Sequence, residues 1–337
     1  MSKKSLCLVT GGAGFIGSHL VEGLLDKGYS VRVLDNLSTG KLSNLKGMKG
    51  SLQFQKGDLR KMDDLKKTVK GVKYVFHFGA NRAVLRSVDD PLETNEVNVT
   101  GTLKLLIAAR NAGVKRLVFS SSSSVYGNTS KFPSKETDIP APESPYAASK
   151  IMGEYYCKQF TDLYGMETVS LRYFNVFGPR QNPESKYSAV IPIFIEHLLK
   201  GKSPEIHWDG KQSRDFSYVD NVVEGNLKAM TAPGAAGKVF NIACHEEYSV
   251  LDIFHGIAKI LKIKNIKPVF LPKRAGDVRR TYADITKSKK ILKFKTQTLF
   301  YEGLEKTVAW FLAPAPMRRH NGSRPKSPRS RLAGGAK

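Results

Sequence analysis

The chain has 337 residues, of which 41% are hydrophobic and 25% are charged, the composition of a globular protein large enough to bury one or two cores. The apolar run Leu6–Val9 is too short for a signal peptide, and no run is long enough for a membrane span. We therefore expect a cytoplasmic protein with no membrane partner. Three widely separated cysteines, Cys7, Cys157 and Cys244, indicate neither a disulfide framework nor a metal site.

The formal net charge of +24 could indicate affinity for nucleic acid or for a membrane surface. Part of this charge is local, because the segment 316–337 contains seven Lys and Arg residues and no Asp or Glu. The segment is rich in Ser, Pro and Gly and nearly free of large apolar side chains, so residues 314–337 are expected to form a basic disordered tail. No nucleic-acid recognition motif accompanies the charge, and we expect no specific nucleic acid partner.

The segment from Leu6 to Leu20, LCLVTGGAGFIGSHL, predicts a strand, a tight turn and a helix. The apolar run fits one buried strand, and apolar residues return at helical spacing among three glycines. Glycines in such a turn let the backbone approach a pyrophosphate, which binds to the unpaired N–H groups at the helix N-terminus. An ordinary turn is the alternative, so the motif depends on its context. The residues expected to bind a dinucleotide here are Gly11, Gly14, Phe15, Ile16 and Gly17.

A second predicted strand, Tyr29–Leu34, ends at Asp35, about 20 residues beyond the glycines, where this fold places an acid that binds the ribose hydroxyls. A carboxylate at this position repels the 2′-phosphate of NADP, so the predicted cofactor is NAD; a plain strand-end turn is the alternative. Two later strands, Leu52–Gln55 and Val72–Phe78, end in segments that can pass close to the same cofactor. The residues expected at these strand ends are Asp35, Asn36, Asp58, Leu59, Phe78, Gly79 and Ala80.

Strands and helices alternate through the first half of the chain. Helices are expected over Asp63–Val69 and from Pro91 through Asn98 to Ala112, and a further strand over Val114–Ser120. This alternation predicts an α/β fold: a Rossmann-type doubly wound parallel sheet with helices on both faces.

Serines occupy positions Ser120–Ser124, at the carboxyl end of a strand, where ligands bind in open α/β sheets; for the serines alone, a polar loop is the alternative. The next motif, PYAASK, opens a predicted helix that places Tyr146 and Lys150 on one face. A free tyrosine hydroxyl titrates near pH ~10 and is a poor base at neutral pH. A neighbouring ammonium and a cationic nicotinamide would lower the pKa of Tyr146 toward the working range. In this context the pair predicts a catalytic base and its partner.

With these motifs in place, the sequence resembles the extended short-chain dehydrogenase/reductases and, within them, the UDP-sugar 4-epimerases. The resemblance extends to about residue 313. It rests on TGGAGFIGSHL, Asp35, SSSSSVYG and YAASK and, more specifically, on LRYFNVFGPRQ (Leu171–Gln181), SRDFSYVDN (Ser213–Asn221) and RAGDVRRTYAD (Arg274–Asp284). Gly79 departs from the more usual alanine, and we expect no functional loss from this change.

The resemblance implies roles for individual residues. Ser122 would face the 4′-hydroxyl of the sugar, with Tyr146 as the base and Lys150 as its partner. Arginine suits the diphosphate of the substrate because its planar fork binds two oxygens at once. Asn175, Arg214 and Arg274 would hold that diphosphate, Asp277 would bind the uridine ribose, and Asn98 would belong to the cofactor site. The substrate residues expected in all are Arg82, Ser122, Ser123, Asn175, Arg214, Arg274, Asp277 and Thr281.

Residues 1–175 are expected to form the NAD-binding domain, to which residues 215–248 return. A smaller α/β domain, residues 176–214 and 249–313, would bind the nucleotide sugar. The elements expected in this half are helices over Ala189–Lys200, Val219–Met230, Ser249–Lys262 and Leu299–Leu312, a strand over Lys238–Ala243 and a short extended piece at Ile206–Asp209. Because the family usually pairs through two helices per subunit, here Val99–Ala112 and Ala148–Tyr164, a homodimer is expected.

The function implied is NAD-dependent 4-epimerisation of UDP-hexoses. Thr281 is a small residue at a position that resembles a size gate beside the C2 substituent of the sugar, which predicts turnover of UDP-GlcNAc/UDP-GalNAc as well as UDP-Glc/UDP-Gal; an ordinary strand residue is the alternative. Related 4,6-dehydratases and UDP-glucuronate decarboxylases carry an acid just after the strand-end hydroxyl, where this chain has Ser123 and Ser124. A non-catalytic regulator that binds a nucleotide sugar or NAD is an alternative of another class.

Overall fold

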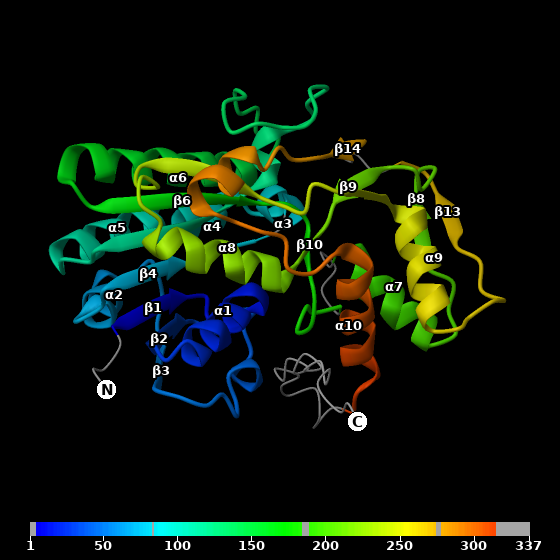
Figure 1. The fold of residues 1–337 in the computed structure, drawn as a ribbon, viewed down its shortest axis with the longest axis horizontal. Coiled ribbons are helices and arrows are strands. Elements are labelled where there is room, and N and C mark those ends of the chain that lie inside the picture. Colours follow the sequence, from blue (N-terminus) through cyan, green and yellow to red (C-terminus); the bar gives the residue numbers. More distant parts are fainter. Residues whose placement is uncertain (1–4, 83, 184–188, 274–277, 315–337) are drawn as a thin grey trace, which may run out of the picture.

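The computed structural model describes residues 5–82, 84–183, 189–273 and 278–314 (Figure 1). Its central sheet has seven strands in the order β11-β6-β5-β4-β1-β2-β3, and each neighbouring pair is parallel. This arrangement confirms the predicted doubly wound sheet. The strands are β1 (Leu6–Thr10), β2 (Ser30–Asp35), β3 (Leu52–Lys56), β4 (Tyr74–His77), β5 (Arg116–Ser122), β6 (Glu167–Tyr173) and β11 (Lys238–Ile242).

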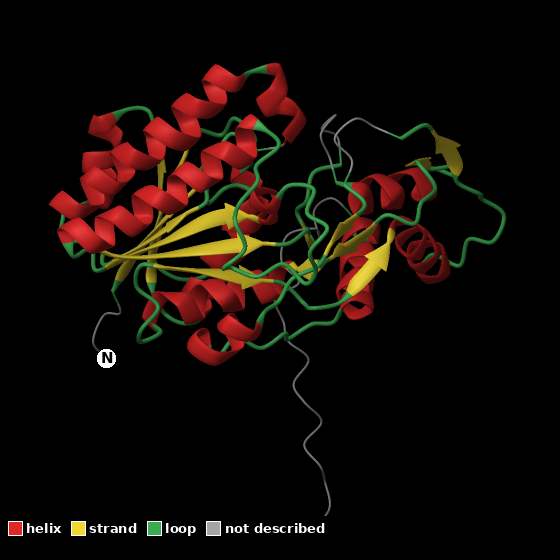
Figure 2. Cartoon of the chain, turned by 90° about the horizontal axis from the view of Figure 1, so that it is seen from above, coloured by secondary structure: helices red, strands yellow, loops and turns green. Residues whose placement is uncertain are grey.

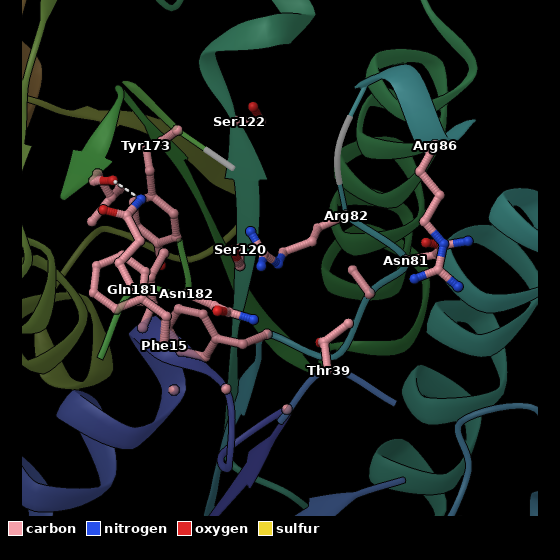
Figure 3. Close-up of a pocket in the computed structure, with 18 of the residues that line it drawn as sticks. Phe15, Thr39, Asn81, Arg82, Arg86, Ser120, Ser122, Tyr173, Gln181 and Asn182 are labelled. Atoms are coloured by element: carbon pink, nitrogen blue, oxygen red, sulfur yellow. Dashed lines mark hydrogen bonds between the residues drawn. The ribbon is translucent and has the colours of Figure 1, made fainter. Parts of the chain in front are cut away.

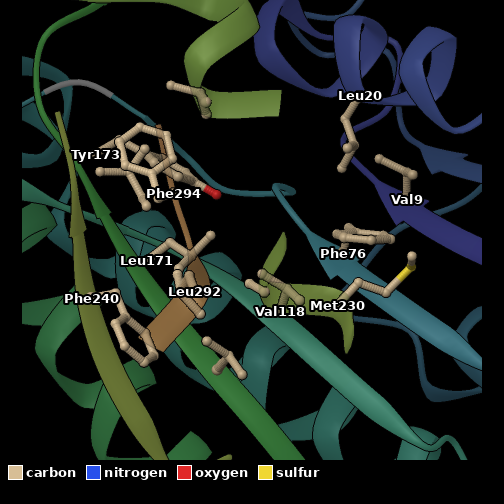
Figure 4. Close-up of a cluster of buried hydrophobic side chains, with 14 of the residues drawn as sticks. Val9, Leu20, Phe76, Val118, Leu171, Tyr173, Met230, Phe240, Leu292 and Phe294 are labelled. Carbon is tan, nitrogen blue, oxygen red and sulfur yellow. The ribbon is translucent and has the colours of Figure 1, made fainter. Parts of the chain in front are cut away.

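The sheet separates two hydrophobic cores, which explains why its strands read as continuous apolar runs rather than alternating ones. In β1, Cys7 and Val9 enter one core and Leu8 enters the other. The first core packs against α1 (Phe15–Asp26) and α8 (Val219–Thr231), and Figure 4 shows part of it. The second packs against α2 (Met62–Val69), α5 (Gly101–Asn111) and α6 (Pro145–Tyr164). Figure 2 shows the sheet between the two helical layers.

The single helix expected from Pro91 to Ala112 is interrupted. It begins as α4 (Pro91–Asn95), widens into a π-helical turn at Glu96–Thr100, and continues as α5. A short helix that the sequence did not predict, α3 (Val84–Asp89), precedes it. The apolar spacing predicts the helix, but the π turn follows from hydrogen bonds that the buried Asn98 makes to other elements, and such contacts are invisible in a local pattern.

The remaining elements pack around a third core at one end of the sheet. Its helices are α7 (Val190–Leu199), α9 (Val250–Ile260) and α10 (Phe300–Leu312). A three-stranded sheet carries β9 (Ser213–Asp215) between β12 (Glu247–Ser249) and β14 (Arg280–Thr281). Two small parallel pairs complete this part, β7 (Val176–Phe177) with β10 (Ser217–Tyr218), and β8 (Glu205–His207) with β13 (Val269–Leu271).

Two elements from the second half of the chain return to the first sheet. Strand β11 pairs with β6 at the sheet edge, and α8 packs against α1. In Figure 2 the arrowheads of the central sheet point toward the second part of the chain, so the carboxyl ends of its strands face that part. In an open α/β sheet this is the edge where ligands bind. No helix in the described part of the chain combines the length and the apolar character that crossing a membrane requires.

Candidate functional site

One cavity of about 1200 Å³ runs along the carboxyl ends of the strands into the second part of the chain (Figure 3). It brings together most of the residues that the sequence singled out. Asn98 does not line it, and Arg274 and Asp277 lie outside the described residues. The predicted residues that line it are Gly11, Gly14, Phe15, Ile16, Gly17, Asp35, Asn36, Asp58, Leu59, Phe78, Gly79, Ala80, Arg82, Ser122, Ser123, Tyr146, Lys150, Asn175, Arg214 and Thr281.

The glycine turn leaves no room for side chains. Gly11 has a φ of 68°, and a Cβ atom there would lie 2.8 Å from the backbone nitrogen of Gly79. A Cβ atom on Gly17 would lie 2.3 Å from the carbonyl oxygen of Gly11. The first turn of α1 therefore packs directly on the loop and faces the cavity with N–H groups that have no partner within the helix. This cradle fits a pyrophosphate.

Asp35 joins this turn to the end of β2. Its Oδ2 accepts a hydrogen bond from the backbone N–H of Ala13 at 3.0 Å, and its Oδ1 accepts one from Leu37 at 2.8 Å. Burial raises the pKa of the carboxyl, while these two hydrogen bonds oppose the rise. Each carboxylate oxygen keeps a second lone pair, so Asp35 can still accept from ribose hydroxyls. Together with the glycine cradle, this acid fits NAD.

Asp58, expected at a strand end close to the cofactor, forms an ion pair with a neighbouring arginine. Arg60 donates two hydrogen bonds to its carboxylate, at 3.0 and 2.7 Å, and this contact lowers the pKa of Asp58 to about 2. The carboxylate is therefore ionised at neutral pH and remains at the cavity wall.

Asn98, expected in the cofactor site, is buried and does not line the cavity; its side chain binds the loop at Asn81. Its Oδ1 accepts from the N–H of Asn81 at 2.7 Å, and its Nδ2 donates to the carbonyl of Asn81 and to Ser149 Oγ, each at 3.0 Å. Ser149 in turn donates to the carbonyl of Tyr146 at 2.7 Å. Asn98 thus connects the loop at Asn81 to the first turn of α6.

A buried hydrogen-bond chain that sequence reasoning missed supports the same loop. The Nδ1 of His77 lies 2.7 Å from Thr10 Oγ1, and its Nε2 lies 2.9 Å from Thr102 Oγ1. Thr10 Oγ1 also accepts from the N–H of Gly79 at 3.1 Å. Burial lowers the pKa of His77 to about 3, so the ring is neutral and serves as a connector. In the sequence, a single histidine at the end of a strand does not indicate that it will connect two threonines by hydrogen bonds.

Tyr146, Lys150 and Ser122 meet at the end of β5. Ser122 lies close enough to Tyr146 to lower the pKa of its hydroxyl, and Lys150 Nζ lies 5.7 Å from the centre of the tyrosine ring. Lys150 is 4% exposed, and its Nζ donates to the carbonyl of Ser120 at 2.8 Å. Burial lowers the pKa of Lys150 to about 8, and the ammonium is still the main form at neutral pH.

The protein groups alone raise the pKa of Tyr146, whereas the fall expected from the sequence depends also on a bound nicotinamide cation. Burial is the largest cause, and it outweighs the Ser122 hydrogen bond and the positive charge of Arg82, both of which lower the pKa. The ammonium of Lys150 is directed at the Ser120 carbonyl rather than at the phenol oxygen. Arg82 is exposed, but to the cavity that it lines, and Figure 3 shows its side chain reaching toward Ser120.

The far end of the cavity holds Asn175, Arg214 and Thr281. Asn175 has a φ of 33°, and its Nδ2 donates to Thr281 Oγ1 at 2.9 Å and to the carbonyl of Asp215 at 3.1 Å. The buried Asp215 holds this corner together, because its carboxylate accepts from the N–H groups of Cys244 and His245 at 3.0 and 3.2 Å. Burial raises the pKa of Asp215 to about 7.

Three further cavity residues follow Asn175 on the loop after β7, namely Arg180, Gln181 and Asn182. Arg180 forms an ion pair with Glu22 on α1, so the loop is anchored to the helix whose first turn faces the cavity. The sequence assigned these residues no individual role. The motif FGPRQN could have indicated them, because it directly continues the segment that contains Asn175.

Comparison with known proteins is consistent with this site. Residues 7–243 match the family described as "NAD dependent epimerase/dehydratase family". A UDP-glucose 4-epimerase of Mycolicibacterium smegmatis is 40% identical over 314 residues, which cover 90% of this chain and 97% of that protein.

Two solved structures each have a TM-score of 0.87. One is a UDP-N-acetylglucosamine 4-epimerase from Methanobrevibacter ruminantium in complex with UDP-N-acetylmuramic acid, with 43% identity and coverage of 92% of this chain and 98% of that one. The other is a UDP-glucose 4-epimerase from Thermotoga maritima with UDP-glucose, with 39% identity and coverage of 91% and 98%.

Proposed function

Because the chain belongs to the NAD-dependent epimerase/dehydratase family, we propose that it catalyses the 4-epimerisation of a UDP-hexose through a 4-keto sugar. The observation that carries the proposal is the meeting of Tyr146, Lys150 and Ser122 at the end of β5, inside a cavity that begins at the glycine turn and continues to Asn175. One end of this cavity fits NAD, and the other can accept a nucleotide sugar.

The glycine turn, the first turn of α1 and Asp35 would hold NAD, with its ribose hydroxyls on the carboxylate. When bound, NAD would supply the acceptor for the hydride from C4 of the sugar and, once reduced, the donor that returns it to the opposite face of the ketone. Asp35 favours NAD over NADP because a 2′-phosphate would meet its negative charge. The loop at Gly79 and Ala80, fixed by the His77 chain, limits where the cofactor can lie.

Tyr146 takes the proton from the 4′-hydroxyl as the hydride leaves, and returns it when the ketone is reduced. Ser122 lies beside Tyr146 and would orient the 4′-hydroxyl of the sugar. The positive charge of Arg82 lowers the pKa of Tyr146 and so favours the phenolate; Lys150, 5.7 Å from the centre of the tyrosine ring, and the cationic ring of NAD would add to this effect. A positioned acid–base group of this kind contributes about 10²–10⁴-fold to a rate.

Arg214 and Asn175 are the described residues that we propose for the diphosphate, together with Arg274; Asp277 would bind the uridine ribose. Thr281 lines the cavity beside Asn175, and its small side chain leaves space where an N-acetyl group could lie. We therefore propose that both UDP-GlcNAc/UDP-GalNAc and UDP-Glc/UDP-Gal are substrates.

The serine-rich strand end disfavours elimination or decarboxylation. The positions after Ser122, where the related dehydratases and decarboxylases carry an acid, hold Ser123 and Ser124. Ser123 lines the cavity, and Ser124 Oγ donates to Ser122 Oγ at 2.9 Å. A non-catalytic regulator would not need the complete set of Ser122, Tyr146 and Lys150.

The assembly is also a proposal. We propose a homodimer formed through the helices Val99–Ala112 and Ala148–Tyr164; on the second helix, Tyr155 and Leu163 are 54% and 71% exposed. Exposed apolar side chains of this kind are compatible with an interaction surface. We also propose the two-domain division expected from the sequence, and a cytoplasmic location, which the three free, buried cysteines support.

The direct test is incubation of the purified protein with each of the four UDP-sugars, followed by chromatographic separation of the products. Interconversion of gluco and galacto isomers without added reductant supports the proposal. Appearance of a 4-keto-6-deoxy sugar or of a pentose would establish the alternative chemistry, and no turnover at all would favour the regulator.

A further inference from the structure

A second set of contacts lies directly behind the catalytic tyrosine. Tyr146, Lys150 and Glu154 follow one another at intervals of four on α6, so they share one face of the helix. Each is attached to the end of β5. Lys150 Nζ donates to the carbonyl of Ser120, and Ser121 Oγ donates to Glu154 Oε1 at 2.5 Å. Tyr146 lies beside the hydroxyl of the next serine, Ser122, which lowers its pKa. Three successive strand residues are thus bound by three successive turns of the helix.

Glu154 is held by a second partner. Arg172 donates from Nε to Glu154 Oε1 at 2.9 Å and from Nη2 to Oε2 at 2.7 Å, and the two side chains are only 4% and 5% exposed. Arg172 lies on β6, paired in register with Ser121 on β5. Its guanidinium also stacks 4.7 Å from the ring centre of Tyr126, in the turn after Ser122. Neither Glu154 nor Arg172 lines the cavity, so neither can touch NAD or the sugar.

A buried ion pair of this kind needs an explanation. Removing two charges from water costs about as much as, or more than, their attraction returns, and apolar residues of the same volume often stabilise a fold better. The pair is therefore poorly explained by stability alone. Its place one helical turn beyond Lys150 suggests that the reaction uses the charge of the carboxylate.

Glu154, paired with Arg172, is the acid that follows Lys150 on the same face of α6. On α6, Tyr146 and Cys157 face the lysine, and burial raises the pKa of both, so both are neutral at pH 7. On β4, His77 is neutral because burial lowers its pKa to about 3. On β5, the lysine meets the Phe119 ring and a backbone carbonyl. Burial lowers the pKa of Lys150 to about 8; the negative charges of a Cys157 thiolate and of Glu154 both oppose this fall, and Cys157 is a neutral thiol at pH 7.

We propose that Glu154, clamped by Arg172 and Ser121, is a positioning residue: it holds the first turns of α6 against the end of β5 and keeps Lys150 positively charged at neutral pH. The catalytic meaning of this role rests on the proposed function, but the charge of Lys150 can be measured independently of turnover. Tyr146 then lies beside a lysine that is positively charged at neutral pH, although this lysine is almost completely buried.

The test follows the titration of Lys150 in the full-length protein labelled with ¹³C at lysine Cε, where the resonance is assigned by its loss in Lys150→Met. Glu154→Gln removes the charge, and the double variant Glu154→Gln/Arg172→Met removes the unpaired cation as well. Glu154→Asp retains the charge on a shorter stem. We expect the titration midpoint of Lys150 to fall by about one pH unit in Glu154→Gln, and to fall in the same direction in the double variant. In Glu154→Asp it should stay near the wild-type midpoint.

The double variant separates positioning from stability. Its melting temperature should recover relative to Glu154→Gln, because no charge is left buried without a partner, while the alkaline limb of its pH–rate profile should stay shifted to lower pH. A double variant as stable as the wild type, with an unchanged Lys150 midpoint and an unchanged pH profile, would overturn the inference. A wild type that titrates as expected but does not epimerise UDP-sugars would instead refute the proposed function.

Discussion

Replacing Thr281 by tyrosine tests what sets substrate breadth. Thr281 lines the cavity on β14, and its Oγ1 accepts a hydrogen bond from Asn175 Nδ2 at 2.9 Å. Thr281→Tyr therefore makes two changes: it removes that acceptor and it adds an aromatic ring beside Asn175. Loss of one neutral hydrogen bond costs about 1 kcal/mol, or about fivefold, and affects every substrate alike. Steric exclusion of a substituent adds about 1–3 kcal/mol, or about 10–200-fold, against N-acetylated sugars alone.

Thr281→Val is the matched control, because it keeps the size of threonine and lacks the hydroxyl. The assay is kcat/KM for UDP-GlcNAc and for UDP-Glc, measured by separation of the epimers. We expect Thr281→Val to lower both values equally, and Thr281→Tyr to lower the UDP-GlcNAc value about 10–200-fold more than the UDP-Glc value. Equal losses for both substrates in Thr281→Tyr, or a wild type that does not turn over UDP-GlcNAc, would refute this reasoning.

Tyr146→Phe should lower kcat by about 10²–10⁴-fold and leave NAD bound, as measured by single-turnover kinetics and cofactor content; near-normal turnover would refute its role as the base. The pKa of Lys150 is lowered from 10.5 to about 8 in the fold, so the unfolded chain binds more protons between these values and wild-type stability rises with pH there. The melting temperature of the wild type relative to Lys150→Met should therefore increase between pH 8 and 10.5, and a constant difference would argue against a buried cation. Asp35→Ala should relax discrimination against NADP in binding titrations, whereas a wild type that prefers NADP would contradict the ribose assignment. A chain ending at Ala315 should keep its rate and melting temperature, because the basic tail has almost no large apolar side chain to bury; a large loss of either would give the tail a structural role.

The parallel sheet was predictable because buried strands and amphipathic helices each leave a local signature. Residues 6–9 form a continuous apolar run because the side chains of β1 enter two cores in turn. The ends of these strands were predictable because the apolar run stops there. Asp35 and Ser122 are the last residues of β2 and β5. The small three-stranded sheet was not predicted, because β9 and β14 contain only Ser213–Asp215 and Arg280–Thr281, too few residues to show a period.

Within the site, residues that touch the cavity were easier to predict than residues that act on others. Tyr146 and Lys150 carry a spacing signal, whereas the roles of Asn98 and His77 depend on partners 17 and 67 positions away in the chain. The rise that burial gives to the pKa of Tyr146 was not predicted, for a related reason. The sequence shows that a lysine is close, but it does not show how deeply the phenol is buried or that Lys150 donates to the Ser120 carbonyl.

The central claim is that one bound NAD removes a hydride from C4 of the sugar and returns it to the opposite face. The most direct measurement uses UDP-glucose deuterated at C4, incubated with the purified protein in ordinary water without added cofactor. The proposal predicts UDP-galactose that retains the deuterium at C4, detected by NMR and mass spectrometry. Inversion with loss of the deuterium to water, or no inversion at C4 by protein shown to contain NAD, would contradict it.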